Sequence, residues 1–361
     1  MIGREQRMIT TRPYTDADNS ALLEIEKLCP QGDDKCALGV DKKGDILARY
    51  KMYDNWKLLV AEDEGKVAGW IGWTLKDGPL KSAKYAYLAE VMVHPNFRRK
   101  GLAKTLINEV ERDCKERGAD HVYCFIYEPN LASKSLFEVA GYSEKAILWQ
   151  CALMVYKRAG ILQEYSIKNP GIEDLQEVVH LVNNYNKSHA HFAPFTKESF
   201  EAYVSGIPAY GLNNFWVAKK GGEIVACAGL WNSSYLADLC YAREPAALKA
   251  MGRIFSVLGR LIKLPKIPPE GEKLNFRMMA NYAFDPGYPE AMEELIGFLN
   301  NRLQEARVDC LLHVIDPEDM SFATIKRMKP QIEKWSVYAK VLNGSPASFR
   351  PFYVDARDLI P

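Results

Sequence analysis

The stretch LAEVMVHPNFRRKGLAKTLI, residues 88–107, constrains the fold more than any other part of the chain. Its first six residues are apolar and partly β-branched, which is typical of a buried strand. Pro95 ends that strand because proline cannot donate to a sheet ladder. From Leu102 onward the apolar residues recur on one side of a helix. The stretch therefore predicts a strand, a loop and a helix in direct succession.

The loop in this stretch carries three consecutive cations, Arg98, Arg99 and Lys100, followed by Gly101. A helix N-terminus has free backbone N–H groups and a partial positive charge, so it holds anions. A glycine there lets a phosphate approach without meeting a Cβ atom, and Lys104 adds a cation one turn later. This pattern favours a phosphate site. A plain helix start with a solvated basic turn is the alternative interpretation.

These residues resemble the acyl-CoA signature of the GNAT superfamily of N-acyltransferases, R/Q-x-x-G-x-G/A, here Arg98-x-x-Gly101-x-Ala103. Residues 130–142 resemble a second family motif, N-x-x-[A/S]-x-x-L-[Y/F]-x-x-x-G-[F/Y]. The resemblance implies that backbone N–H groups at 99–104 bind the CoA pyrophosphate, and that the strand edge at 91–93 and Asn130 hold the pantetheine arm. It implies these cofactor-binding residues: Val91, Met92, Val93, Arg98, Arg99, Lys100, Gly101, Leu102, Ala103, Lys104, Asn130, Ser133 and Phe137. For Asn130 alone, a plain helix N-cap is the alternative.

The order of the elements predicted for residues 8–157 is β-α-α-β-β-β-α-β-α-β, which is the GNAT order. The second of these helices is expected around residues 46–53. The resemblance implies an α/β (α+β) fold with a mixed, mostly antiparallel central sheet flanked by helices. We expect residues 1–158 to form this domain and to bind acetyl-CoA.

The second half repeats the first. Val60-Ala61 and Gly72 recur at one constant spacing as Val217-Ala218 and Gly229, and Val93-His-Pro resembles Phe284-Asp-Pro. The phosphate loop does not recur, because residues 289–294 contain three carboxylates and neither a glycine nor a cation. We therefore expect residues 159–361 to form a degenerate GNAT-like domain without CoA binding. It has an insertion at about 235–273, with a helix at about 246–262, and a short strand pattern at 348–355.

Composition argues for a soluble globular protein, because 48% of the residues are hydrophobic and 26% are charged. A net charge of +1 gives no field that would favour nucleic acid or a membrane as the main partner. The eight cysteines form no C-x-x-C pair, so a reduced, cytoplasmic location is expected. The pair His189 and His191 lacks further ligands at zinc spacing, and no metal site is expected.

Acyl transfer to an amine needs a group that takes the proton from an ammonium. Glu90 is the only carboxylate inside the strand of residues 88–93, and burial there should raise its pKa, as a base requires. Its alternative role is a structural partner for a nearby cation. Many members of the superfamily carry a tyrosine where this chain has Phe137, which has no proton to give. Tyr127, Tyr142 and Ser133 are near in sequence and could replace it.

The acceptor cannot be identified from the sequence. The segment of residues 29–56 is expected to line the amine side, and it contains several carboxylates and aromatic residues, namely Asp33, Asp34, Asp41, Asp45, Asp54, Tyr50, Tyr53 and Trp56. Such residues suit a cationic amine, but we favour a solvated loop. The sequence predicts an N-acetyltransferase that moves an acetyl group from acetyl-CoA to a small-molecule or protein amine in a ternary complex. The alternatives are a catalytically silent acyl-CoA sensor or scaffold, and a longer acyl chain.

Overall fold

The computed structural model describes residues 9–78, 83–258, 262–344 and 348–359. The strands are β1 Ile9–Pro13, β2 Gln31–Gly32, β3 Ala37–Asp41, β4 Trp56–Asp63, β5 Lys66–Asp77, β6 Lys84–Val93, β7 His121–Tyr127, β8 Ser143–Met154, β9 Ser166–Lys168, β10 Phe215–Lys220, β11 Glu223–Trp231, β12 Asp238–Arg243, β13 Phe276–Phe284, β14 Cys310–Ile315 and β15 Gln331–Val341. The α-helices are α1 Asn19–Leu28, α2 Leu102–Glu116, α3 Leu131–Val139, α4 Leu175–Asn186, α5 Lys197–Gly206, α6 Ala246–Leu258, α7 Pro289–Glu305 and α8 Phe322–Arg327.

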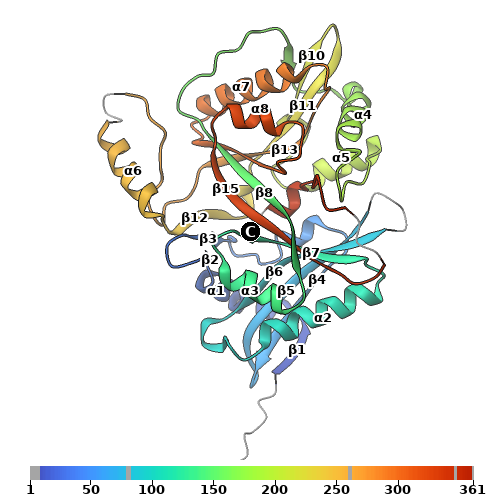
Figure 1. Cartoon of the computed structure of the whole chain (residues 1–361), viewed down its shortest axis with the longest axis vertical. Helices are drawn as coiled ribbons and strands as arrows, with labels where there is room; N and C mark the ends of the chain where they lie inside the picture. Colours follow the sequence, from blue (N-terminus) through green and yellow to red (C-terminus); the bar gives the residue numbers. More distant parts are fainter. Residues whose placement is uncertain (1–8, 79–82, 259–261, 345–347, 360–361) are drawn as a thin grey trace, which may run out of the picture.

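One continuous sheet of twelve strands runs through both halves of the molecule, in the order β1-β4-β5-β6-β7-β15-β8-β14-β13-β11-β10-β9 (Figure 1). Among these neighbours only β6 with β7 and β13 with β14 run parallel. The predicted fold class, a mixed and mostly antiparallel sheet flanked by helices, is confirmed. The sequence did not predict that the sheets of the two halves join into one.

The two halves exchange their last strands. β15, near the end of the chain, lies between β7 and β8 of the first half, and β8 in turn pairs with β14 of the second half (Figure 1). Every central strand therefore has a neighbour on both edges, which leaves no unpaired ladder at the junction. Because of this exchange, each half completes the sheet of the other.

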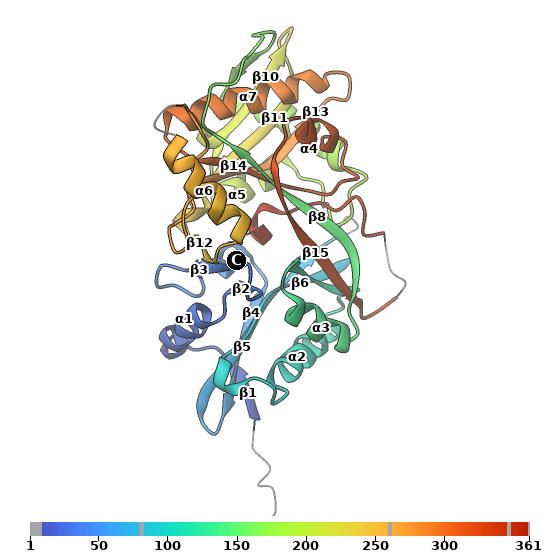
Figure 2. The ribbon, with the colours of Figure 1, turned by 60° about the vertical axis from the view of Figure 1, so that its left-hand side comes forward.

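Alternation along the strands separates two layers of the first half. Ile71 and Trp73 of β5 face α2 in one apolar cluster, whereas Trp70 of the same strand packs with residues of α1 in another. Figure 2 shows α2 and α3 next to each other in this half, with α1 at the opposite side. The apolar stripe of α2 is at most 1% exposed, so the predicted amphipathic helix is confirmed.

In the described part of the chain every helix falls short of the length and apolarity needed to cross a bilayer.

The halves share a local packing detail that the sequence repeat did not reveal. A Cβ atom added to Gly72 of β5 would lie 1.9 Å from the hydroxyl of Tyr50, and one added to Gly229 of β11 would lie 1.6 Å from the hydroxyl of Tyr210. Only glycine lets the tyrosine ring lie against the strand at these places. The same tyrosine–glycine contact in both halves supports the repeat.

Several local predictions were wrong. The helix expected at 46–53 is only a 3-10 turn, Tyr50–Met52, and strands β2 and β3 were not predicted. These two strands form a small separate sheet with β12 of the insertion. By contrast, the helix expected at 246–262 is confirmed over the described residues Ala246–Leu258 as α6, and residues 259–261 lie outside the described residues.

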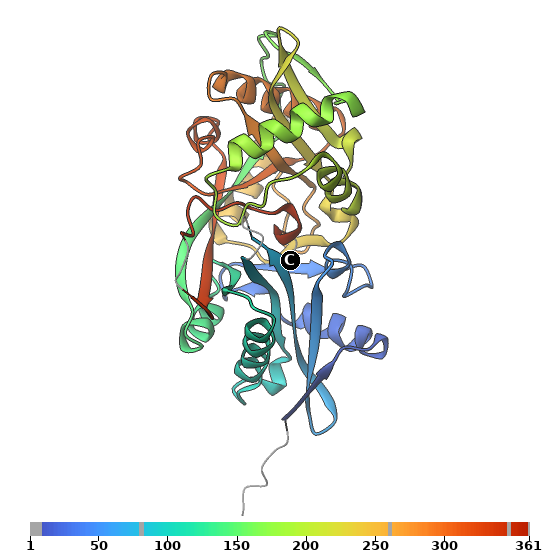
Figure 3. The ribbon, with the colours of Figure 1, turned by 90° about the vertical axis from the view of Figure 1, so that its right-hand side faces the viewer.

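The strand expected at 348–355 is also absent from the described residues 348–359. There Phe352 makes a single isolated bridge to Ala190. The described part of the chain ends in a 3-10 turn, Ala356–Leu359, in which Ala356 and Asp358 are buried and which lies between the two halves (dark red in Figure 3). The carboxylate of Asp358 accepts hydrogen bonds from Lys76 Nζ at 2.5 Å and from Tyr123 at 2.6 Å. The tail is therefore anchored by charge rather than by a strand.

We expect Asp358→Asn to lower the free energy of unfolding by about 3–5 kcal/mol, because it leaves the buried ammonium of Lys76 with one carboxylate partner fewer. Urea unfolding followed by circular dichroism measures this change. Asp54→Asn removes the same charge from an exposed loop position and should change stability by less than about 0.5 kcal/mol. Equal stability of the two variants would contradict the anchoring role of the tail.

Candidate active site

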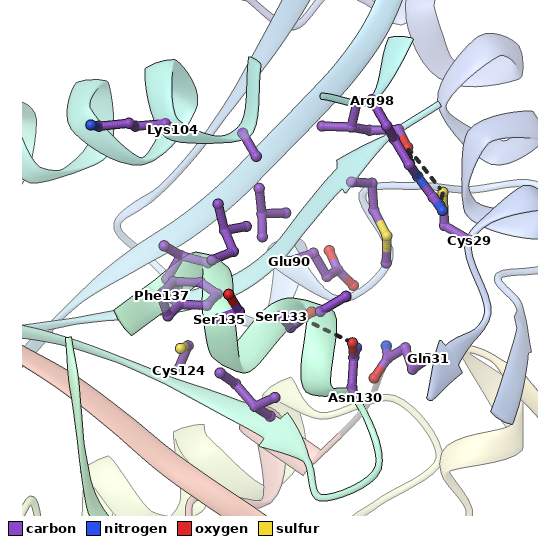
Figure 4. Close-up of a pocket in the computed structure, with 18 of the residues that line it drawn as sticks. Cys29, Gln31, Glu90, Arg98, Lys104, Cys124, Asn130, Ser133, Ser135 and Phe137 are labelled. Carbon is purple, nitrogen blue, oxygen red and sulfur yellow. Dashed lines mark hydrogen bonds between the residues drawn. The ribbon is translucent and has the colours of Figure 1, made fainter. Parts of the chain in front are cut away.

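A cavity of about 620 Å³ lies where β6 and β7 separate. The two strands pair only from Tyr85–Tyr87 to His121–Tyr123 and then diverge. Beyond this point the edge of β6 that faces β7 has no strand partner among the described residues. Apart from the carbonyl of Val93, which Arg98 occupies, its backbone groups are available to a ligand. The walls of the cavity are formed by β6, β7, the start of α2, the helix α3 and residues 29–32, which follow α1 (Figure 4).

Most of the residues predicted to bind the cofactor line this one cavity. They are Val91, Met92, Val93, Arg98, Arg99, Gly101, Leu102, Ala103, Lys104, Asn130, Ser133 and Phe137. Lys100 is the exception. Its Nζ lies 2.8 Å from the carboxylate of Asp63 and 4.7 Å from the ring centroid of Phe97. The structure therefore places its charge outside the cavity.

The loop before α2 has the backbone of an anion site. Gly101 is the N-cap with φ of 86°, a left-handed conformation that favours glycine, and Arg99 has φ of 63°. No side chain caps the helix, so its first N–H groups are available to a ligand. Arg99 and Lys104 are exposed and form no ion pair within the described residues. Their charge is therefore free to neutralise a phosphate.

Arg98 has a different role in this loop. Its Nε donates to the carbonyl of Val93 at 3.1 Å, and its Nη2 lies 3.2 Å from the sulfur of Cys29 (Figure 4). These contacts tie the end of β6 to the end of α1. The guanidinium is thus held in place at the cavity wall, where its remaining N–H groups face solvent.

The far wall of the cavity is the start of α3. The carbonyl oxygen of the Asn130 side chain accepts the backbone N–H of Ser133 at 3.1 Å and so caps the helix (Figure 4). Its amide nitrogen has no partner within the described residues. Phe137 is buried and packs edge-on against Tyr142, with ring centroids 5.0 Å apart. Of the proton donors considered for the position of Phe137, Ser133 and Tyr127 line the cavity, whereas Tyr142 does not.

Glu90 lies at the floor of the cavity inside a buried charge cluster. Its carboxylate forms an ion pair with Lys42 Nζ, lies 3.2 Å from Arg49 Nη1 and accepts the hydroxyl of Tyr50 at 2.5 Å. Glu26, also buried, lies 3.9 Å from Lys42. Burial raises the pKa of Glu26 to about 7, and the charge of Lys42 opposes this shift. Glu26, Lys42 and Arg49 were not predicted, because no sequence pattern joins them to Glu90.

The expected rise in the pKa of Glu90 is wrong. Burial alone would raise it, but the charges of Lys42 and Arg49 together outweigh burial, and the pKa lies below its ordinary value. A carboxylate held ionised by two cations is a weak proton acceptor. The contacts therefore favour the alternative role, a partner of nearby cations.

We expect Glu90→Gln to lower the free energy of unfolding at pH 7 by about 3–5 kcal/mol, because two buried cations lose their partner. A lowered pKa in the folded state stabilises the fold above the ordinary carboxyl pKa, and this contribution is lost as the pH falls. The difference from wild type should therefore shrink below about pH 4.5. Tyr50→Phe, which removes one hydrogen bond to the same carboxylate, should cost less, about 1.5–3 kcal/mol. A Glu90→Gln deficit that does not vary with pH would contradict the ionised state.

The segment of residues 29–56 lines the cavity only at its start, through Cys29, Pro30, Gln31 and Gly32. None of its described aspartates faces the cavity, and Asp34, Asp41 and Asp54 are exposed. Its aromatic residues Tyr50 and Tyr53 are buried in the core. The favoured interpretation of these carboxylates as a solvated loop agrees with this arrangement. No pattern in the sequence predicted that Gln31 and Gly32 would line the cavity.

In the second half, side chains occupy the place between β13 and β14 that corresponds to the cavity between β6 and β7. β13 and β14 also pair over a short parallel stretch and then diverge. Between them the rings of Tyr282 and His313 lie 4.4 Å apart, and Asp319 accepts hydrogen bonds from His189 and Tyr282, each at 2.9 Å. Asn281, an uncharged amide that accepts the hydroxyl of Tyr210 at 3.1 Å, takes the place of Glu90 in the repeat.

The start of α7, which corresponds to the phosphate loop, also differs. Pro289 begins the helix, and Glu290 lies in its first turn. Glu294 is buried and accepts the backbone N–H of Tyr165 at 3.4 Å. This carboxylate therefore holds the segment that links the two halves.

Sequence comparison identifies the family. The model of the acetyltransferase (GNAT) family matches residues 21–142. Acetyltransferase plu1384 of Photorhabdus laumondii is 34% identical over 129 residues, which are 35% of this chain and 82% of that protein. Acetyltransferase YE1169 of Yersinia enterocolitica is 32% identical over 127 residues, which are 35% of this chain and 80% of that protein. The chain belongs to the acetyltransferase (GNAT) family and is an acyltransferase that uses an acyl-CoA.

Solved structures resemble the whole chain. A GCN5-related N-acetyltransferase from Sphaerobacter thermophilus superposes with a TM-score of 0.61 at 14% identity, over 94% of this chain and 97% of that one. A tandem GNAT protein from the clavulanic acid biosynthesis pathway has a TM-score of 0.58 at 11% identity, over 94% of this chain and all of that one. At these identities the similarity shows the fold alone.

Proposed function

We propose that this protein is an N-acetyltransferase that moves an acetyl group from acetyl-CoA to an amine by direct transfer in a ternary complex. The observation that carries the proposal is the convergence of the 98–104 loop, the free edge of β6 and the start of α3 on one cavity. The named relatives are acetyltransferases, which favours acetyl over a longer acyl group. The arrangement also leaves two free cations, Arg99 and Lys104, at a helix N-terminus.

The residues of this chain fit a phosphorylated cofactor. The N–H groups that follow Gly101, with Arg99 and Lys104, would hold the pyrophosphate, and Val91 to Val93 and Asn130 would hold the pantetheine arm. The thioester supplies an activated acyl group. The ammonium would first lose one proton to a base or to water. As the neutral amine forms the new C–N bond, the C–S bond breaks, and a second proton passes from the amine to the sulfur, so that CoA leaves as the thiol.

The base stays a prediction. Glu90 is the residue that the sequence favoured, and its lowered pKa makes it a weaker candidate. Turnover by Glu90→Gln, measured from about pH 6 to 9, decides this point. Unchanged turnover across that range would exclude Glu90 as the base, and the folded state of the variant is checked by its melting temperature.

We propose two domains, residues 1–158 for acetyl-CoA and residues 159–361 as a degenerate repeat. The second unit has Tyr282, His313 and Asp319 where the first has its cavity. Its uncharged Asn281 and the acidic start of α7 also support the loss of CoA binding. The insertion at 235–273 contributes β12 to the small sheet and so joins the two units.

We expect Gly101→Ala to weaken acetyl-CoA binding about tenfold or more, because a Cβ enters the path of the phosphate and the left-handed backbone becomes strained. Gly118→Ala is the matched control, since Gly118 also has a positive φ, of 79°, with open space around it, and it follows the opposite end of α2. Isothermal titration calorimetry with acetyl-CoA measures both variants. Equal affinity in the two would contradict the phosphate site.

A thiol-release assay with acetyl-CoA and a panel of amines tests catalysis. We expect CoA release that depends on both substrates and that follows no burst, as direct transfer requires. Acetyl-CoA binding without CoA release for any amine would favour the sensor alternative.

A further inference from the structure

A small recess adjoins the acyl cavity on the face of the sheet opposite α2 and α3. It shares Gln31, Ala89 and Phe125 with the cavity. Its other walls come from both halves of the chain. They combine aliphatic, aromatic, amide and carboxylate side chains with the guanidinium of Arg49, which is already bound to Glu90 and to the carbonyl of Asp358, and they are Arg49, Tyr87, Leu148, Gln150, Val314, Trp335, Asp358 and Leu359. A molecule that reaches the acyl group from this side would therefore contact residues of the second half.

Glu333 of β15 lies beside this recess, two residues from Trp335 on the same face of the strand. Its carboxylate accepts hydrogen bonds from Gln150 Nε2 at 3.0 Å and from the hydroxyl of Tyr241 at 3.1 Å. Both donors are neutral, and no cation within the described residues forms an ion pair with Glu333. The adjacent Lys334 lies over the ring of Trp149, so it does not compensate the charge.

An uncompensated carboxylate in this half-buried place is costly. Burial raises the pKa of Glu333, and the hydroxyls of Tyr241 and Tyr127 only partly oppose the shift. The buried charged clusters around Glu90 and Asp358 contain their own cations. Glu333 therefore differs from them in lacking a positive partner.

Tyr127 connects Glu333 with the acyl cavity. It lines the cavity, its hydroxyl lies 3.3 Å from the sulfur of Cys36, and its ring centroid lies 5.1 Å from that of Trp335. The indole N–H of Trp335 is buried and has no acceptor among the described residues. Aromatic faces next to an unpaired carboxylate are suited to an ammonium group.

We infer that Glu333, supplied by the second half through the exchanged strand β15, recognises the ammonium group of a cationic amine acceptor with an apolar or aromatic body. This inference rests on the proposed function. The ammonium would supply the missing positive partner, and Tyr127 and Trp335 would flank it. The exchange of strands thereby gives the second half a part in substrate selection.

Matched ligand pairs test this inference by binding, without turnover. The probes are 2-phenylethylamine against 2-phenylethanol and n-butylamine against 1-butanol, titrated by calorimetry into the full chain in the presence of CoA, which carries no acyl group. We expect wild type to bind at least one ammonium about tenfold more tightly than its alcohol. Glu333→Gln should lose this preference, because its amide cannot balance the charge. Glu144→Gln, which removes an exposed charge from the neighbouring strand β8, should keep it.

Kinetics with any amine that is acetylated supply a second measurement. We expect Glu333→Gln to raise the KM for the amine about tenfold, with kcat and the KM for acetyl-CoA unchanged. Melting temperatures of both variants identify a folding defect. Retention of the ammonium preference by Glu333→Gln, or its absence from wild type in both pairs, would overturn the inference. Failure of wild type to bind acetyl-CoA would instead overturn the proposed function.

Discussion

The parallel pairing of β6 with β7 stops after Tyr87 and Tyr123, and the shape of the site depends on this early separation. Where the strands diverge, one edge of β6 is left without a neighbouring strand among the described residues, and the N-terminus of α2 lies at the same opening. Free N–H groups in a sheltered place bind a polar ligand well, because little competing water must be displaced. The same backbone arrangement between β13 and β14 is filled by Tyr282, His313 and the Asp319 network. Side chains thus decide whether the divergence of two strands produces a cavity or a core.

The two halves are interlocked at the level of charge as well as of strands. Arg49 approaches Glu90 beneath the cavity and also donates to the backbone carbonyl of Asp358 at 2.6 Å. The carboxylate of Asp358 in turn holds Lys76. A chain of buried polar contacts therefore runs from the floor of the cavity to the last turn of the described chain. Buried charge-assisted hydrogen bonds are strong in such surroundings, so the contacts of Asp358 with Lys76 and Tyr123 anchor the tail.

The sequence predicted what depends on local chemistry. The apolar stripe of α2, the glycine at its start and the helix cap that was the alternative role of Asn130 each follow from neighbouring residues, and all are present. Errors arose where a distant residue decides the outcome. Lys100 turns to Asp63, thirty-seven positions away, and Lys42 and Arg49 reverse the expected pKa shift of Glu90. Net charge and spacing contain no information about such pairs, because they form only when the sheet brings separate strands together.

The sequence by itself determined the strand–loop–helix unit, the duplicated order of elements and the loss of the phosphate loop from the second copy, since these depend on periodicity and on residue types at short range. Only the tertiary structure decided that the copies share one sheet and exchange their last strands. It also decided that Glu333 of the second half lies beside the recess that adjoins the cavity of the first half. The physical reason is that strand neighbours are chosen by the burial of both edges across the whole molecule, a condition that no single stretch of sequence contains.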